Sequence, residues 1–170
     1  YFTTNLGGTE NVIAACRANG VGRLVYTSTP SVAFDRRDLV GADEHTPYAR
    51  RPLCAHAASK IEAERVVLQA DSSQLRTIAL RPHLVWGPGD HNLIPRLLER
   101  GRAGALKVVG DGTNRVDITY IDNAVQAHLL AADNLAGSAS AAGQALFVGQ
   151  AAPVALWPWI NGLFARVDIP

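Results

Sequence analysis

The chain has 170 residues, of which 48% are hydrophobic and 18% are charged, and its 16 basic and 15 acidic side chains leave a net charge of +1. This length is enough for one domain with a real core, and the composition is that of an ordinary globular protein. No basic stripe is interleaved with aromatic residues, and no stretch of about 20 apolar residues occurs, so we expect neither nucleic-acid binding nor a membrane span. The cysteines Cys16 and Cys54 are isolated, which suits a reducing compartment and predicts a cytoplasmic location.

The beginning of the chain does not resemble a natural start. The sequence contains no methionine, and its first residues, "YFTTNLGGTENVIAACRANG", read as the middle of a domain. We expect no signal or transit segment before them. We therefore expect an incomplete chain, either a fragment or the product of a truncated gene.

The first half of the chain alternates predicted helices with buried strands. In order, we expect a helix over 9–19 ended by Gly20, a strand over 23–28, a polar loop over 29–55, a helix over 56–71 and a strand over 75–80 stopped by Pro82. A loop of this length is uncommon in a compact domain and is often functional. The alternation predicts parallel βαβ units in an open α/β sheet, where ligands lie beyond the carboxyl ends of the strands.

The second half is predicted to contain shorter elements. They are a turn over 86–90, a helix over 92–101 with Pro95 in its first turn, a hairpin over 106–121 around Asp111-Gly112, a helix over 123–133, a strand over 145–148 and a helix over 155–165. Asp122 is expected to cap the helix over 123–133. The apolar face of that helix is expected to include Val125, Leu129 and Ala132.

Three polar side chains are predicted to meet at one edge of this sheet. Thr29 lies just past the first strand, and His56 and Lys60 are four residues apart, so one helix face presents both. A hydroxyl, a proton donor and an ammonium suit proton transfer coupled to hydride transfer. The simpler alternative is an ordinary helix with two solvated polar residues. The histidines in loops lack the spacing of metal ligands, and we expect no metal site.

Several segments, in order, carry a resemblance to a known family. They are "NLGGTENVIAACRANGVGRLVYTSTPSVAF", "HAASKIEAERVV", "LRPHLVWGPGDHNLIPRLLERG", "VGDGTNRVDITYIDNAVQAHLLAAD" and "GQALFVGQAAPVALWPWI". Together they resemble the extended short-chain dehydrogenase/reductase superfamily, also called the NAD-dependent epimerase/dehydratase superfamily. The most similar branch is that of the 3β-hydroxysteroid dehydrogenase/isomerase-like proteins, which also contains 2-alkyl-3-oxoalkanoate reductases.

The resemblance implies a doubly wound, parallel-sheet Rossmann domain with a small C-terminal substrate domain, each present here in part. Residues 1–85 would form the second half of the Rossmann domain, residues 86–115 a substrate-domain segment, residues 116–135 a return to the Rossmann domain, and residues 136–170 a further substrate-domain segment. The glycine-rich turn that holds the dinucleotide pyrophosphate in the family belongs to the first half of that domain. Gly7-Gly8 follows no strand and is no substitute for it.

The family uses a Ser or Thr together with a Tyr and a Lys spaced Y-x-x-x-K. On this pattern the hydroxyl falls on Thr29 and the lysine on Lys60, while the tyrosine position is occupied by His56. In the family the tyrosine moves a proton to or from the substrate oxygen, the lysine lowers the pKa of that phenol and binds the nicotinamide ribose, and the hydroxyl steadies the oxygen. Tyr48 is the nearest upstream tyrosine, but Pro52 occupies its +4 position, so it does not restore the motif.

Histidine at the tyrosine position leaves two interpretations open. An imidazole can transfer protons near neutral pH. It is also shorter than a phenol by roughly the reach of one water molecule, and catalytic hydrogen bonds span about 2.6–3.2 Å, so a bridging water could complete the path. The chain could therefore use His56 as an altered acid, or it could bind a dinucleotide without reacting.

The resemblance also implies a cofactor site and a reaction class. Lys60, Asn5 and the segment Pro82, His83 and Leu84 match positions near the cofactor, which would be NAD or NADP; alternatively Asn5 is a helix N-terminal cap and Pro82 simply ends a strand. The implied activity is oxidoreduction between a secondary alcohol and a ketone, of 3β-hydroxysteroid or β-keto acid type, on a small hydroxy or keto substrate. The alternatives are a non-catalytic dinucleotide-binding protein and a sugar-nucleotide epimerase or dehydratase. A full-length protein of this kind could form a homodimer.

Overall fold

The computed structural model describes residues 1–169, and the chain divides into two compact units. The first unit comprises Tyr1–Pro82 and Val125–Val148, and the second comprises His83–Ala124 and the residues from Gly149 onward. No helix in the described part of the chain is long and apolar enough to cross a membrane.

The first unit is built on a three-stranded parallel sheet. Its strands are β1 (Arg23–Thr27), β2 (Arg76–Pro82) and β6 (Gln144–Val148), in the order β1-β2-β6. Thr27 at the end of β1 lies opposite Leu80, and Pro82 at the end of β2 lies opposite Val148. The predicted parallel α/β sheet is therefore confirmed. β6 belongs to this sheet, whereas residues 136–170 were expected to form a segment of the substrate domain.

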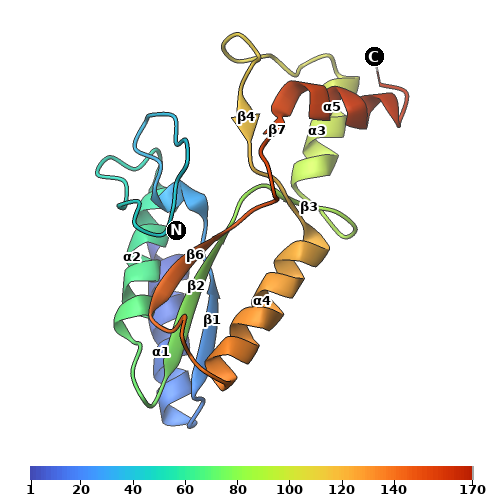
Figure 1. The fold of residues 1–170 in the computed structure, drawn as a ribbon. Helices are drawn as coiled ribbons and strands as arrows, with labels where there is room; N and C mark the ends of the chain where they lie inside the picture. Colours follow the sequence, from blue (N-terminus) through green and yellow to red (C-terminus); the bar gives the residue numbers. More distant parts are fainter. Residues whose placement is uncertain (170) are drawn as a thin grey trace. The chain divides into compact units, whose positions relative to one another are not determined.

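Helices cover both faces of this sheet (Figure 1). A π-helical turn (Thr3–Gly7) leads into α1 (Gly8–Ala18), and α2 (Ala55–Gln69) follows the long loop. On their side of the sheet, one core cluster consists of Ile13, Cys16, Val67, Ala70 and Leu75, with Leu24 and Tyr26 of β1 packed against it. On the other face, Ile78 and Leu80 of β2 pack against α4 (Ile121–Ala136). Successive side chains of β2 therefore face α2 and α4 in turn, because neighbouring residues of a strand point to opposite faces of the sheet.

The inward face of α4 differs from the prediction. The helix begins at Ile121, so Asp122 lies in its first turn and is not the N-cap. Val125 and Leu129 are 49% and 56% exposed, and Ala132 is also exposed. The buried residues of the helix are Ala124, Ala131 and Leu135. Apolar residues occur all round this helix, and the small alanines form the face that lies close to β2, so hydrophobicity alone indicated the wrong face.

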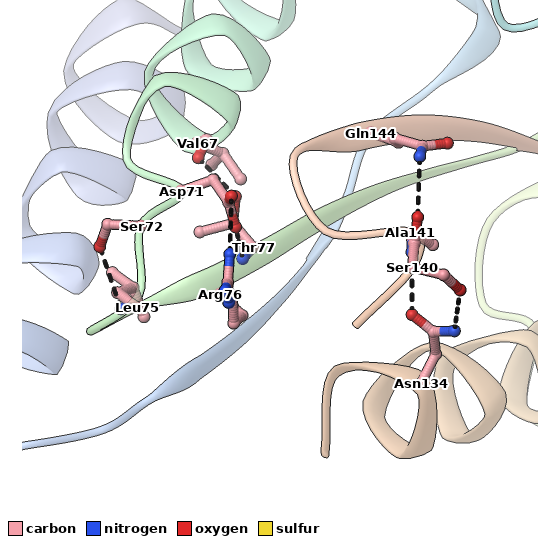
Figure 2. A network of polar contacts seen from close by, with 10 residues as sticks. All are labelled: Val67, Asp71, Ser72, Leu75, Arg76, Thr77, Asn134, Ser140, Ala141 and Gln144. Carbon is pink, nitrogen blue, oxygen red and sulfur yellow. Dashed lines mark hydrogen bonds and ion pairs between the residues drawn. The ribbon is translucent and has the colours of Figure 1, made fainter. Parts of the chain in front are cut away.

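Polar contacts fix the turn between α2 and β2 (Figure 2). The buried Thr77 hydroxyl donates to the Val67 carbonyl at 2.8 Å, and the Thr77 backbone N–H donates to the Asp71 carboxylate at 2.8 Å. The Leu75 N–H donates to the Ser72 hydroxyl at 3.1 Å. These contacts hold the C-terminal end of α2 against the first residues of β2.

The second unit contains short strands and two helices. Its elements are β3 (Val85–Trp86), α3 (Leu93–Arg102), β4 (Arg115–Val116), β5 (Thr119–Tyr120), β7 (Val154–Ala155) and α5 (Leu156–Ala165). The predicted hairpin around Asp111-Gly112 is wrong, because β4 pairs with β7 in antiparallel fashion and β5 pairs with β3 in parallel fashion. The Asp111 side chain instead closes a local turn by accepting hydrogen bonds from the N–H and the hydroxyl of Thr113.

Two helical glycines, one in α3 and one in α5, are predicted to respond in opposite ways to replacement by alanine. A Cβ at Gly101 would lie 2.5 Å from the Phe164 ring, which is buried in the core of the second unit. A Cβ at Gly162 of α5 would meet nothing within 4 Å. We expect Gly101→Ala to destabilise the chain by about 1–3 kcal/mol through overpacking, and Gly162→Ala to stabilise it by up to about 1 kcal/mol. Urea unfolding of both variants measures this, and equal effects would contradict the packing described.

Candidate active site

Lys60 lies at the carboxyl end of β1. Its ammonium donates a hydrogen bond to the Thr27 carbonyl, with Nζ and O 2.7 Å apart, and lies 4.2 Å from the centroid of the Tyr26 ring. Burial lowers the pKa of the Lys60 ammonium, and the negative charge of Glu64 partly opposes that shift. Burial also raises the pKa of the Tyr26 phenol to about 12, so this ring stays neutral beneath the ammonium.

The Thr27 side chain points to the opposite face of the sheet from Lys60. Its hydroxyl lies 2.8 Å from Nε2 of His128, which belongs to α4. The end of β1 is therefore held from both sides, by Lys60 through the Thr27 main chain and by His128 through the Thr27 side chain.

His56 lies in the first turn of α2 and is half-buried. Its ring meets the ring of Tyr1 edge to face, with centroids 5.7 Å apart. The His56 carbonyl accepts a hydrogen bond from the Ser59 hydroxyl at 2.8 Å, and the Asn5 amide donates to the same hydroxyl at 2.9 Å. Asn5 thus contacts α2 near His56. It lies inside the π-helical turn (Thr3–Gly7), so its interpretation as a helix cap is wrong.

Thr29 lies two residues past the end of β1 and begins a 3₁₀ turn, η2 (Pro30–Val32). Its hydroxyl oxygen accepts a hydrogen bond from the Ser31 N–H at 3.3 Å and lies 3.1 Å from the Ser31 hydroxyl. Thr29 is half-buried. The hydroxyl therefore has a defined direction at the same strand end that Lys60 contacts.

The three predicted residues after the second strand are divided between the units. Pro82 is the last residue of β2 and belongs to the first unit, while His83 and Leu84 are the first residues of the second. Burial lowers the pKa of the His83 imidazole, and the Asp117 carboxylate opposes this. Leu84 has a φ of +42°, which is a rare conformation for a bulky residue and one that clusters at functional segments.

A buried ion pair near Lys60 was not predicted from the sequence. Glu64 and Arg81 are 0% and 4% exposed, and they form two hydrogen bonds of 2.6 and 3.1 Å. The Tyr48 hydroxyl donates to the same Glu64 carboxylate at 2.8 Å. Burial raises the pKa of the Tyr48 phenol, as does the Glu64 charge. The sequence did contain an indication of this pair. Glu64 lies four residues after Lys60, and Arg81 is a charged residue at the end of an apolar strand.

A parallel sheet with helices on both faces and polar groups at its carboxyl edge defines the class as a Rossmann-like α/β protein. The model of the 3-beta hydroxysteroid dehydrogenase/isomerase family matches residues 1–170. The chain belongs to this family.

Two curated relatives cover nearly all of the chain. It is 52% identical to 2-alkyl-3-oxoalkanoate reductase of Stenotrophomonas maltophilia over 173 residues, which are 100% of this chain and 52% of the relative. It is 37% identical to the human sterol-4-alpha-carboxylate 3-dehydrogenase, decarboxylating, over 99% of this chain and 46% of the relative. The chain therefore spans about half the length of these relatives.

A solved structure supports the fold. The dTDP-glucose 4,6-dehydratase DesIV of Streptomyces venezuelae, whose structure contains NAD, superposes with a TM-score of 0.81 at 25% identity, over 100% of this chain and 52% of DesIV. The similarity extends over both units of the chain, and it confirms that the parallel sheet is part of a Rossmann-like domain.

Proposed function

We propose that the whole protein is an NAD(P)-dependent oxidoreductase that interconverts a secondary alcohol and a ketone. The substrate class that its relatives favour is a β-keto acid or a 3β-hydroxysteroid, a small molecule and not a nucleic acid. The observation that carries the proposal is the Lys60 ammonium at the carboxyl end of a parallel strand, 2.7 Å from the Thr27 carbonyl, in a chain of this family.

The donors at this strand end fit a dinucleotide ribose. A lysine ammonium has three N–H donors, and only one is needed for Thr27. The remaining N–H groups can donate to ribose hydroxyls. When it is bound, the nicotinamide would supply hydride transfer, and on the family resemblance Asn5, Pro82, His83 and Leu84 are proposed as further cofactor-binding residues.

Each of the three proposed active-site residues has a distinct role. Thr29 would donate a hydrogen bond to the substrate oxygen from the turn after β1. His56 would move a proton to or from that oxygen, either directly or through a bridging water. Lys60 would fix the ribose and place a positive charge near the oxygen, where it favours the deprotonated form of the substrate hydroxyl.

Two alternatives to this function have separate grounds, one in a residue and one in the fold. Because His56 stands where the family has tyrosine, the protein could bind the dinucleotide without turnover. The likeness to DesIV favours a sugar-nucleotide dehydratase or epimerase only through a shared fold. Binding of a uridine or thymidine sugar nucleotide, with no reduction of ketones, would support that second alternative. A homodimer of the whole protein is proposed on the family resemblance alone.

The test is a lysine substitution in a complete enzyme. This chain can be joined to the N-terminal half of the Stenotrophomonas maltophilia reductase, which by the family resemblance supplies the glycine-rich turn. Lys60→Ala should weaken NAD(P) binding about tenfold or more, as expected for the loss of charge-assisted hydrogen bonds. Lys107, which is exposed and is the only other lysine, provides the control Lys107→Ala. Equal and small effects in calorimetric titration would show that Lys60 is only a structural residue.

A further inference from the structure

Two polar side chains, one helical turn apart, connect α2 to neighbouring strands. Lys60 donates to the Thr27 carbonyl at the end of β1, and Glu64 accepts from Arg81 of β2. Thr27 lies opposite Leu80, the residue before Arg81. Both contacts are therefore made at the same level of the sheet, next to its carboxyl edge.

The second of these contacts is part of a larger cluster. Tyr48, from the long loop between β1 and α2, donates to Glu64, and the Arg81 guanidinium carbon lies 5.6 Å from the centroid of the Tyr48 ring. The same carbon also lies 4.9 Å from the centroid of the Phe147 ring of β6. The cluster of Tyr48, Glu64 and Arg81 thus joins α2, β2 and the loop, and it packs against β6.

The hydrogen bonds of this cluster require particular orientations of its side chains, whereas apolar packing does not. A buried ion pair can often be replaced by apolar residues of similar volume without loss of stability, so stability alone does not account for it. Two hydrogen bonds between a planar guanidinium and a carboxylate fix the relative orientation of both groups. In this protein, that orientation sets the rotation of α2 about its axis and its position along β2.

We infer that Tyr48, Glu64 and Arg81 are positioning residues that hold Lys60 against the end of β1, and His56 one turn before it. Through its hydrogen bond to Glu64, Tyr48 also fixes the loop that follows Thr29 to α2. Lys60 contacts the Tyr26 ring and the Thr27 carbonyl on β1, and the charge of Glu64, one turn further along α2, acts on its ammonium. The inference relies on the proposed function only in giving Lys60 a role in the site.

The composition of the chain allows a direct test that requires no substrate. Lys60 and Lys107 are its only lysines, so a nitrogen-detected NMR spectrum of the chain contains two lysine ammonium signals, apart from that of the N-terminal amine. The exchange rate of the ammonium hydrogens with water reports whether each group is held by a hydrogen bond. Lys107 is exposed and lies in the second unit, so it serves as an internal reference.

Glu64→Gln is expected to increase the exchange rate of the Lys60 hydrogens about fivefold, as for the loss of one hydrogen bond of ordinary strength, with no change at Lys107. The matched control is Glu62→Gln, which removes the same charge from the same helix. Glu62 is half exposed and pairs with Arg65, so its loss should leave both signals unchanged. Tyr48→Phe keeps the ion pair and the Glu64 charge that acts on the Lys60 pKa, so a smaller increase in this variant reports positioning and not charge.

The double substitution Glu64→Leu with Arg81→Met covers the case in which Glu64→Gln does not fold. The two apolar side chains fill about the same space but make no directional hydrogen bonds. The exchange rate of the Lys60 hydrogens should therefore increase in this variant too. Unchanged Lys60 exchange in a folded variant that lacks the pair would overturn the inference. The proposed function is tested separately, because Lys60→Ala could leave NAD(P) binding intact even where Glu64→Gln releases the ammonium.

Discussion

Arg81→Met is expected to lower the free energy of unfolding by about 3–5 kcal/mol, the usual cost of leaving one member of a buried ion pair without its partner. Glu64 is completely buried, and with Arg81 removed only the Tyr48 hydroxyl remains to donate to its carboxylate among the contacts described here. Adding Glu64→Leu should recover most of the loss, because both buried charges are then absent. Urea unfolding of the two single variants and the double variant forms a complete cycle.

The exposed pair on the same helix supplies the comparison. Arg65 and Glu62 are 2.8 Å apart, and each side chain is 45% exposed. Arg65→Met should therefore cost less than about 1 kcal/mol. A small loss for Arg81→Met, similar to that of Arg65→Met, would show that the Glu64 carboxylate does not depend on the guanidinium.

His56→Tyr is expected to increase ketone reduction in the complete enzyme by up to about 10²–10⁴-fold, which is the usual contribution of general acid catalysis. The substitution restores the phenol of the Y-x-x-x-K pattern on a helix whose lysine already contacts the end of β1. Steady-state reduction of a 2-alkyl-3-oxoalkanoate, followed through NAD(P)H absorbance, measures the effect.

The control for this substitution is His45→Tyr. His45 is exposed and lies in the loop between β1 and α2, so the same change there should leave the rate unaltered. A fully active parent whose rate falls with His56→Tyr would identify the imidazole as the adapted acid. If neither protein turns over any ketone while both bind the dinucleotide, the non-catalytic alternative is favoured.

The parallel sheet of the first unit could be predicted because its signals are local. β1 and β2 are short apolar runs bounded by glycine, proline and polar residues, and each follows a helix. The predicted hairpin was wrong because the pairing of its strands depends on contacts that are distant in the sequence. Asp111-Gly112 is a strong local turn signal, but β4 and β5 are only two residues long, and each pairs with a strand far away in the sequence.

The candidate site divides in the same way. The relation between His56 and Lys60 is set by the period of one helix, so spacing alone could place them on one face. The contact of Lys60 with Thr27 and that of Glu64 with Arg81 depend on how α2 lies against the sheet, which no local pattern records. A buried charge in an apolar strand requires a partner, and Arg81 could have been recognised on that ground, although its partner could not have been named.

The acceptor for Lys60 belongs to the main chain, and this makes the contact tolerant of sequence change. Every residue type at position 27 would present a carbonyl to Lys60, whereas the hydroxyl that meets His128 on the opposite face is lost in most substitutions. The two faces of this strand end can therefore evolve independently. Residues against α4 can be exchanged to adapt the fold to a new neighbour or temperature while the ammonium keeps its anchor.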